Sequence, residues 1–291
     1  MPAALPPLID ATALLALLAQ PGSEDVLVLD ARFNLMQPEA GQAAWREGHI
    51  PGAWHAHLDR DLSGAKTGAN GRHPLPALAD LGGTLGRWGL TPATRVVVYD
   101  DAGGMFAARA WWLLSWVGHD RVQVLDGGWA AWLAAGGPVS AQAPTERKPT
   151  HLTLTAQTGW LLSAQDVLAS LQGRTPALQL LDARAPDRFR GENETLDPVG
   201  GHIPGAANRF FQLNLQGGRF KPAAQLLGEF EDALPGQDFG QLVHQCGSGV
   251  TACHNLLALA HAGAPMGRLY AGSWSEWCAD PARPRAVGSA G

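Results

Sequence analysis

The hexapeptide GHIPGA occupies residues 48–53 and occurs again, unchanged, at residues 201–206. Three further pairs of similar segments keep the same order in both halves of the chain. The two members of each pair lie about 150 residues apart, a period too long for a solenoid. The sequence therefore predicts two tandem copies of one domain. The other pairs are DAR at 30–32 and 182–184, LIDATALLALL at 8–18 and LLSAQDVLASL at 161–171, and LDGGWAAW at 125–132 and YAGSWSEW at 270–277.

Each half alternates short apolar runs with segments of helical periodicity. The runs VLVLD (26–30) and LQLLD (178–182) are typical of buried strands, as are VVVYD (96–100) and LVHQC (242–246). This alternation predicts an α/β fold in which a mostly parallel sheet is flanked by helices. The predicted helices span 107–118 and 252–263 and end at Gly118 and Gly263, and the predicted N-caps of two earlier helices are Asp10 and Ser163.

The length and composition fit this organisation and exclude several classes of protein. The chain has 291 residues, enough for about two domains. Its net charge of −5 provides no basic face for nucleic acid. No apolar stretch is long enough to span a membrane. We expect an N-terminal domain over 1–138, a polar linker over 139–158 and a C-terminal domain over 159–291.

The three cysteines, Cys246, Cys253 and Cys278, lie near one end of the chain. An odd number in this arrangement does not indicate a disulfide framework, so we expect reduced thiols and a cytoplasmic location. Their spacing with histidine does not match a zinc site, and we expect no metal.

The duplication helps to distinguish structural residues from functional ones. Residues present in both halves are expected to be structural, and residues present in only one half are candidates for a functional role. On this criterion His49 and His202 of the repeated hexapeptide, and the Asp–Arg pairs of the DAR segments, belong to the scaffold. Only the second half contains QCGSGVTACHN (245–255), where the first half has YDDAGGMFAAR (99–109). This difference directs attention to Cys246.

Cys246 follows a predicted strand and precedes a predicted helix, with a glycine-rich loop between them. Backbone N–H groups of such a loop, together with the positive end of the helix, favour an anion on the sulfur. Cys246 is therefore the candidate nucleophile, whereas Cys253 and Cys278 are expected to be inert. A cysteine phosphatase would need an arginine six residues after the cysteine to grip phosphate, and Ala252 stands there.

These features together resemble the tandem-domain rhodanese-type sulfurtransferases, and the match extends over nearly the whole chain. The resemblance implies two rhodanese domains related by a pseudo-two-fold. The loop CGSGVT (246–251) is most similar to that of the 3-mercaptopyruvate sulfurtransferases. Members of the family that use thiosulfate typically carry Arg and Lys where Gly247 and Ser248 stand here.

The resemblance also implies roles for single residues. Arg188, in RFRG (188–191), is similar to the arginine that anchors the substrate carboxylate, with Arg190 as a second candidate. His73 and Asp59 are expected to form a proton relay with Ser248, and Asp61 competes for the place of Asp59. The other loop residues expected to bind substrate are Gly247, Gly249, Val250 and Thr251.

The sequence departs from the family at one point. The segment GENETLDPVGG (191–201) has no arginine, although the family often places a second carboxylate anchor there. Carboxylate binding is then expected to rest on Arg188 alone, or to include Arg190 or Arg209.

The expected reaction moves sulfur from 3-mercaptopyruvate through a Cys246 persulfide to a thiol, such as reduced thioredoxin, or to cyanide. No cofactor is expected. Two alternatives stay open at this point. The first is a thiosulfate sulfurtransferase, and the second is a sulfur-carrier or sensing module without rapid turnover.

Overall fold

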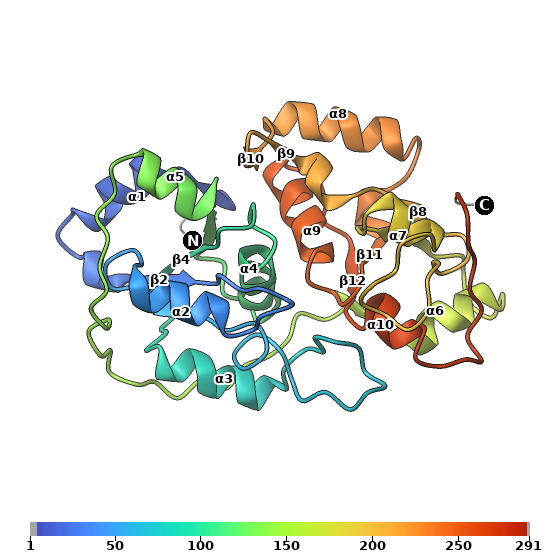
Figure 1. The fold of residues 1–291 in the computed structure, drawn as a ribbon, viewed down its shortest axis with the longest axis horizontal. Helices are drawn as coiled ribbons and strands as arrows, with labels where there is room; N and C mark the ends of the chain where they lie inside the picture. The colour runs from blue at the N-terminus through green and yellow to red at the C-terminus, as the bar shows by residue number, and fades with distance from the viewer. Residues whose placement is uncertain (1–4, 290–291) are drawn as a thin grey trace. The chain divides into compact units, whose positions relative to one another are not determined.

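The structure, a computed structural model, describes residues 5–289. The chain divides into two compact units (Figure 1). The first unit comprises residues 1–64 and 76–157, and the second comprises residues 65–75 and 158–291. The polar stretch that follows the first closing helix thus belongs to the first unit up to residue 157. The short segment 65–75, encoded within the first half, belongs to the second unit.

The first unit contains a five-stranded parallel sheet in the order β1-β5-β4-β2-β3. Helices lie on both faces of this sheet (Figure 1). One face carries an apolar core that includes Leu14 of α1 and Trp132 of α5, while α4 packs against β4 and β5. The strands are β1 (Leu8–Ile9), β2 (Val26–Asp30), β3 (Trp54–His55), β4 (Arg95–Tyr99) and β5 (Val122–Leu125). The helices are α1 (Ala11–Leu18), α2 (Ala40–Glu47), α3 (Leu78–Arg87), α4 (Ala107–Trp116) and α5 (Gly128–Ala134), with a 3₁₀ turn at Ser23–Asp25.

The second unit repeats this topology, with the strand order β6-β12-β11-β7-β8 and parallel pairing throughout. A small antiparallel pair, β9 (Leu215–Gln216) and β10 (Arg219–Phe220), is an addition that the first unit lacks among its described residues. The main strands are β6 (Leu161–Leu162), β7 (Gln179–Asp182), β8 (Ala207–Asn208), β11 (Leu242–Gln245) and β12 (Arg268–Tyr270). The helices are α6 (Ala164–Leu171), α7 (Pro186–Arg190), α8 (Ala223–Ala233), α9 (Ala252–His261) and α10 (Ser273–Trp277), with 3₁₀ turns at Phe211–Asn214 and Phe239–Gln241.

The predicted fold class and the predicted strands and helices are confirmed. Asp10 caps α1 by accepting a hydrogen bond from the N–H of Ala13. Ser163 caps α6 in a reciprocal box with Asp166, in which each side chain accepts from the other residue's backbone N–H. These local interactions satisfy N–H groups that the first turn of a helix leaves without partners.

The repeated motifs meet in one buried network in each unit. In the second unit the guanidinium of Arg184 donates to Asp182 at 2.7 Å and to the carbonyl of Gly201 at 2.7 Å. The same guanidinium lies 4.9 Å from the ring centre of Trp274. Arg32 makes the equivalent contacts in the first unit, to Asp30, Gly48 and Trp129.

The histidines of the hexapeptide complete this network. The backbone N–H of His49 donates to Ser140, and that of His202 donates to Ala286. Both histidine side chains are buried, and each has a backbone carbonyl within hydrogen-bond distance of Nδ1. The repeated hexapeptide therefore fastens the chain that follows each closing helix, which is the structural role the duplication predicts.

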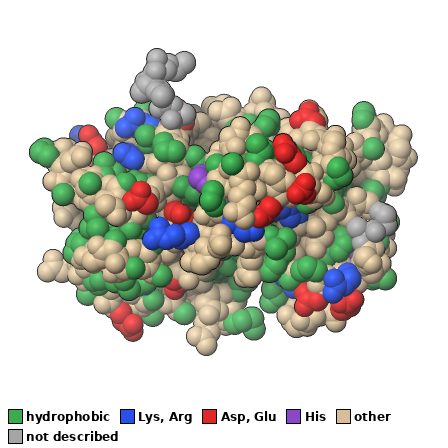
Figure 2. All heavy atoms as spheres, turned by 90° about the horizontal axis from the view of Figure 1, so that it is seen from above, with side chains coloured by type: hydrophobic (Ala, Val, Ile, Leu, Met, Phe, Trp, Pro, Cys, Tyr) green, Lys and Arg blue, Asp and Glu red, His purple; other side chains and the backbone are tan. Residues whose placement is uncertain are grey.

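The surface is mixed in charge. On the face shown in Figure 2, Lys and Arg side chains form small groups interspersed with Asp and Glu. Within residues 5–289, no helix combines the length and the apolar character needed to cross a membrane.

The buried pair gives a prediction for stability. Both side chains of Asp182–Arg184 are almost fully buried. Replacing Arg184 with Gln leaves a buried carboxylate without its charge partner, which costs about 3–5 kcal/mol. We expect urea denaturation of R184Q to show this loss in the second unit. The control is R190Q, which removes a half-exposed arginine paired with Glu192. Equal stabilities of the two variants would contradict the structural role of the buried pair.

Candidate active site

Cys246 lies directly after β11, at the carboxyl end of the sheet in the second unit, and its side chain is buried. Its Sγ accepts hydrogen bonds from the backbone N–H groups of Ser248, at 3.4 Å, and Gly249, at 3.1 Å. Gly249 has a φ of +75°, and a Cβ on it would lie 2.3 Å from the carbonyl oxygen of Ala271. The loop therefore curls around the sulfur as predicted, and only glycine fits at position 249.

The corresponding loop of the first unit is filled by a carboxylate. Asp100 follows β4 as Cys246 follows β11, and its side chain is fully buried. The four N–H groups that donate to its two carboxylate oxygens, at 2.8–2.9 Å, belong to Ala102, Gly104, Phe106 and Ala107. The first unit thus uses its anion cradle as a structural cap, whereas the second presents a sulfur in the same place.

The start of α10 holds the backbone of Cys246. The hydroxyl of Ser273 accepts a hydrogen bond from the N–H of Cys246 at 3.1 Å and donates to the carbonyl of Tyr270. The N–H of Trp274 donates to the carbonyl of Cys246, and the N–H of Ser275 donates to that of Gly247. Three consecutive residues of the closing motif therefore fix the backbone of Cys246 and Gly247.

Ser273 and Ser275 were missed by the sequence reasoning, although the duplication contains the signal. The closing motifs LDGGWAAW (125–132) and YAGSWSEW (270–277) place Gly128 opposite Ser273 and Ala130 opposite Ser275. Gly128 has a φ of +53° and Ser273 has a φ of +54°. Ser273 therefore has a left-handed backbone conformation that glycine adopts freely. Its hydroxyl, which Gly128 lacks, accepts the hydrogen bond from the backbone N–H of Cys246.

Segment 65–75 brings His73 to the cysteine loop. His73 and Ser248 are both buried, and His73 Nδ1 lies 2.8 Å from the Ser248 hydroxyl oxygen. The backbone N–H of the neighbouring Arg72 donates to the hydroxyl of Ser275. Ser275 therefore connects this segment to the cysteine loop, and the predicted contact between His73 and Ser248 is present.

The two acidic candidates for the relay lie in the first unit. The backbone N–H of Asp59 donates to His57 Nδ1 at 3.1 Å. The carboxylate of Asp61 accepts hydrogen bonds from the N–H of His57 and from Arg87. Asp61 is thus engaged within its own unit, and the role of Asp59 stays a prediction.

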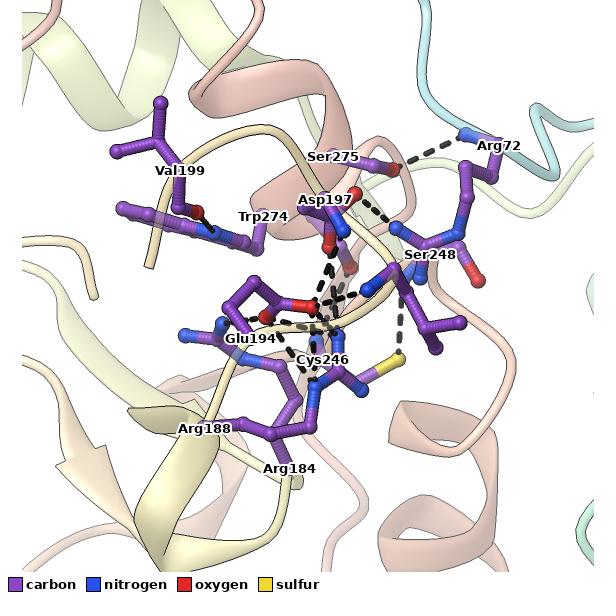
Figure 3. A network of polar contacts seen from close by, with 12 residues as sticks. Arg72, Arg184, Arg188, Glu194, Asp197, Val199, Cys246, Ser248, Trp274 and Ser275 are labelled. Atoms are coloured by element: carbon purple, nitrogen blue, oxygen red, sulfur yellow. Dashed lines mark hydrogen bonds and ion pairs between the residues drawn. The ribbon is translucent and has the colours of Figure 1, made fainter. Parts of the chain in front are cut away.

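Arg188 takes part in an ion cluster beside the cysteine loop (Figure 3). Its guanidinium pairs with Glu194, at 2.7 Å, and lies 3.4 Å from Asp197. Arg72 pairs with the other carboxylate oxygen of Asp197. Arg72 and Arg188 are the groups nearest to Gly247 on the side where a Cβ would stand. The cysteine loop itself contains no cation, but the guanidinium groups of Arg72 and Arg188 lie next to it.

Burial and ion pairing act in opposite directions on the carboxylates of this cluster. Burial opposes ionisation of Glu194, but hydrogen bonds from Arg188 and from the backbone hold its pKa below the ordinary value. For Asp197 the effect of burial prevails and raises the pKa, against the contacts with Arg72 and Arg188. Burial likewise raises the pKa of Cys278 to about 11, which agrees with the expectation that this thiol is inert.

The other candidate anchors make different contacts. Arg190 is half-exposed and pairs with Glu192. Arg209 is buried and contacts Asn214, Glu229 and the ring of Phe230. Neither arginine contacts the cysteine loop through the hydrogen bonds and ion pairs of the described residues. Arg72, which the sequence reasoning did not consider, is the second arginine that lies beside Gly247.

The remaining loop residues supply backbone donors. The N–H groups of Val250 and Thr251 donate to no acceptor among the described residues. Within residues 5–289, no group of three His, Cys, Asp or Glu side chains is placed to hold a metal ion.

Comparison with known proteins extends these findings. The family of rhodanese-like domains matches the chain twice, over residues 10–135 and 163–280. The chain is 51% identical to a probable 3-mercaptopyruvate sulfurtransferase of Pseudomonas aeruginosa, over 97% of this chain and 98% of that protein. It is 40% identical to a putative thiosulfate sulfurtransferase of Mycobacterium tuberculosis, over 92% and 93% of the two chains.

Solved structures give the same result. A 3-mercaptopyruvate sulfotransferase from Escherichia coli matches with a TM-score of 0.78 at 29% identity, over 93% of this chain and 99% of that one. The resemblance drawn from the repeated motifs and the cysteine loop is confirmed.

The contact between Ser273 and Cys246 leads to a prediction. Ser273→Gly removes the hydroxyl but suits the left-handed backbone, so we expect the stability of the fold to be kept. Of the two hydrogen bonds lost, the one to the N–H of Cys246 is worth about 1 kcal/mol, and its loss should change the alkylation rate of Cys246 by iodoacetamide about fivefold. Ser273→Ala removes the same hydroxyl without relieving the backbone, and should also lower the melting temperature. An unchanged alkylation rate in S273G would exclude a positioning role for the hydroxyl.

Proposed function

The chain belongs to the rhodanese-like family and is a sulfurtransferase, and we propose that it takes sulfur from 3-mercaptopyruvate through a persulfide on Cys246. The observation that carries this proposal is the contact between Ser248 and His73, at 2.8 Å, two residues from the sulfur. A donor that leaves as an enolate needs a proton on carbon, and we propose that this pair supplies it.

The first half-reaction forms the persulfide. The Cys246 thiolate attacks the sulfur of 3-mercaptopyruvate, a sulfur–sulfur bond forms, and the bond from that sulfur to carbon 3 breaks. The electron pair of the broken bond passes to the enolate of pyruvate. Ser248 delivers a proton to carbon 3 and recovers one through His73, with Asp59 proposed to orient the imidazole. The proton released by the donor thiol replaces the one spent, so Cys246 is left as the persulfide anion. Pyruvate then leaves, and Arg188 is the proposed anchor for its carboxylate.

The second half-reaction returns the enzyme to its starting state. The N–H groups of Gly249, Val250 and Thr251 are proposed to hold the terminal sulfur of the persulfide. A thiolate acceptor, such as reduced thioredoxin, or cyanide attacks this sulfur, and the electron pair of the sulfur–sulfur bond returns to Cys246. All three cysteines are free thiols. We place the reaction in the cytoplasm, where such thiols stay reduced.

Thiosulfate is the second candidate donor, and one observation favours it. Arg72 and Arg188 lie beside Gly247, so the site holds cations although the loop does not. Sulfite leaves with its own electron pair and needs no proton on carbon. The two donors therefore make different demands on Ser248, which allows an experiment to separate them.

The nucleophile is tested by substitution of each cysteine. Incubation with 3-mercaptopyruvate should add the mass of one sulfur atom to the wild-type protein, as seen by intact mass spectrometry. We expect C246S to gain no sulfur and to lose turnover. Cys253 is buried within α9 and donates to the carbonyl of Gly249, a contact that serine keeps. The variants C253S and C278S should therefore retain most of the activity. Substantial turnover in C246S would refute the mechanism.

The donor is tested with Ser248→Ala. We expect kcat/KM to be higher for 3-mercaptopyruvate than for thiosulfate in the wild-type protein, at matched pH and acceptor concentration. General acid catalysis typically contributes about 10²–10⁴-fold. S248A should lower turnover of 3-mercaptopyruvate by a factor of this order and leave that of thiosulfate nearly unchanged. A wild-type preference for thiosulfate would replace the proposed donor by the second candidate.

A further inference from the structure

Two guanidinium groups converge beside the α-carbon of Gly247. The position that a Cβ on Gly247 would take lies 2.7 Å from Nη2 of Arg72. The same position lies 3.6 Å from Nη2 and 3.8 Å from Nη1 of Arg188. These two arginines are far apart in sequence and come from different segments, yet they face one point next to the nucleophile (Figure 3). A Cβ at position 247 would crowd Nη2 of Arg72, so glycine is the residue that lets both guanidinium groups lie this close.

Each guanidinium is held on one edge and available on the other. Arg188 donates through Nε and Nη2 to Glu194, and its Nη1 has no hydrogen bond among the described residues. Arg72 donates through Nη1 to Asp197, and its Nη2 likewise has none. The carboxylates therefore fix both planes in orientation and leave an N–H edge of each directed toward Gly247.

The charges around this point balance. Arg184 pairs with Asp182, Arg188 with Glu194, and Arg72 with Asp197. Three guanidinium groups thus face three carboxylates, and the cluster carries no net charge. Such a site binds an anion through directed N–H donors rather than through excess positive charge. It suits a carboxylate with one negative charge better than a dianion beside a thiolate.

We infer that Arg72 and Arg188 together form the seat for the substrate carboxylate, and that the absence of a side chain at Gly247 lets both guanidinium groups approach this point. This inference rests on the proposed function and names its ligand class, a monocarboxylate that carries the transferable sulfur. Arg72 is then a substrate-binding residue that replaces the arginine absent from segment 191–201. Asp197 sets the orientation of Arg72 and limits the charge of the seat.

The test compares two donors that differ only in the carboxylate. 1-Mercaptopropan-2-one keeps the carbonyl and the thiol of 3-mercaptopyruvate but has a methyl group in place of the carboxylate. We expect Arg72→Gln to lower kcat/KM for 3-mercaptopyruvate about ten- to a hundredfold, the effect of one charged hydrogen bond. The value for 1-mercaptopropan-2-one should stay within about twofold, a margin well below that effect. Equal losses with both donors would make Arg72 a structural residue and overturn the inference.

A matched control removes the same charge elsewhere. Arg219 lies exposed in β10 of the same unit. Arg219→Gln should leave both donors unaffected. A loss with R219Q equal to that with R72Q would show that overall charge, rather than the seat, governs donor binding.

A binding measurement tests the seat without turnover. Pyruvate keeps the carboxylate and lacks the sulfur, so it should protect Cys246 of the wild-type protein from iodoacetamide, as followed by peptide mass mapping. Protection should need about ten- to a hundredfold more pyruvate in R72Q. Absence of protection in the wild-type protein would overturn the seat. If the wild-type protein does not turn over 3-mercaptopyruvate, the proposed function fails, and pyruvate protection alone then decides for or against the seat.

The charge balance is tested separately with Asp197→Asn. The amide oxygen still accepts a hydrogen bond from Arg72, but the cluster gains one positive charge. We expect kcat/KM for thiosulfate to rise severalfold relative to that for 3-mercaptopyruvate. An unchanged ratio would overturn the argument from charge.

Discussion

A buried charge needs hydrogen-bonding and ionic partners from within the protein, and the same arrangement of such partners surrounds a buried Asp–Arg pair in both units. Asp182 and Arg184 are almost completely removed from solvent, so each hydrogen-bonding group of the pair needs an acceptor or donor nearby. The carbonyl of Gly201 and the ring of Trp274 meet part of that need, and Glu194 forms an ion pair with Nη1 of Arg184 at 3.6 Å. The strand end, the GHIPGA hexapeptide and the closing helix are therefore parts of one network. This explains why the same three motifs recur together around Asp30 and Arg32.

The two units show how little separates a structural cap from a reactive centre. Both end a central strand in a loop whose N–H groups point inward, and both follow that loop with a helix. In the first unit the carboxylate of Asp100 takes four of these donors. In the second unit the smaller sulfur of Cys246 takes two. The serines of the closing motif then add hydroxyl groups where the first unit has Gly128 and Ala130. The two central loops therefore differ through substitutions at a few positions of a shared strand–loop–helix frame.

The features that the sequence predicted are those set by local interactions or by the repeat. Strands such as VLVLD, the N-caps Asp10 and Ser163, and the loop around Cys246 follow from periodicity, capping and glycine, which act over a few residues. The contact of His73 with Ser248 required a resemblance to known proteins, because nothing local links residues so far apart. Arg72 escaped prediction for the same reason. Its side chain is recognised as part of the site only once segment 65–75 is placed with the second unit.

The position of segment 65–75 explains why the two halves of the chain cannot be treated as independent domains. The half that carries Cys246 holds its own sulfur cradle, but His73 and Arg72 are encoded on the other side of the boundary, within the copy that has no cysteine. The cysteine-bearing unit therefore depends on a segment that is encoded in the other half of the chain. The domains have thereby ceased to be interchangeable modules. A gene fragment encoding only residues 159–291 would lack Arg72 and His73, so it would specify the cysteine loop without the segment that contacts Ser275 and Ser248.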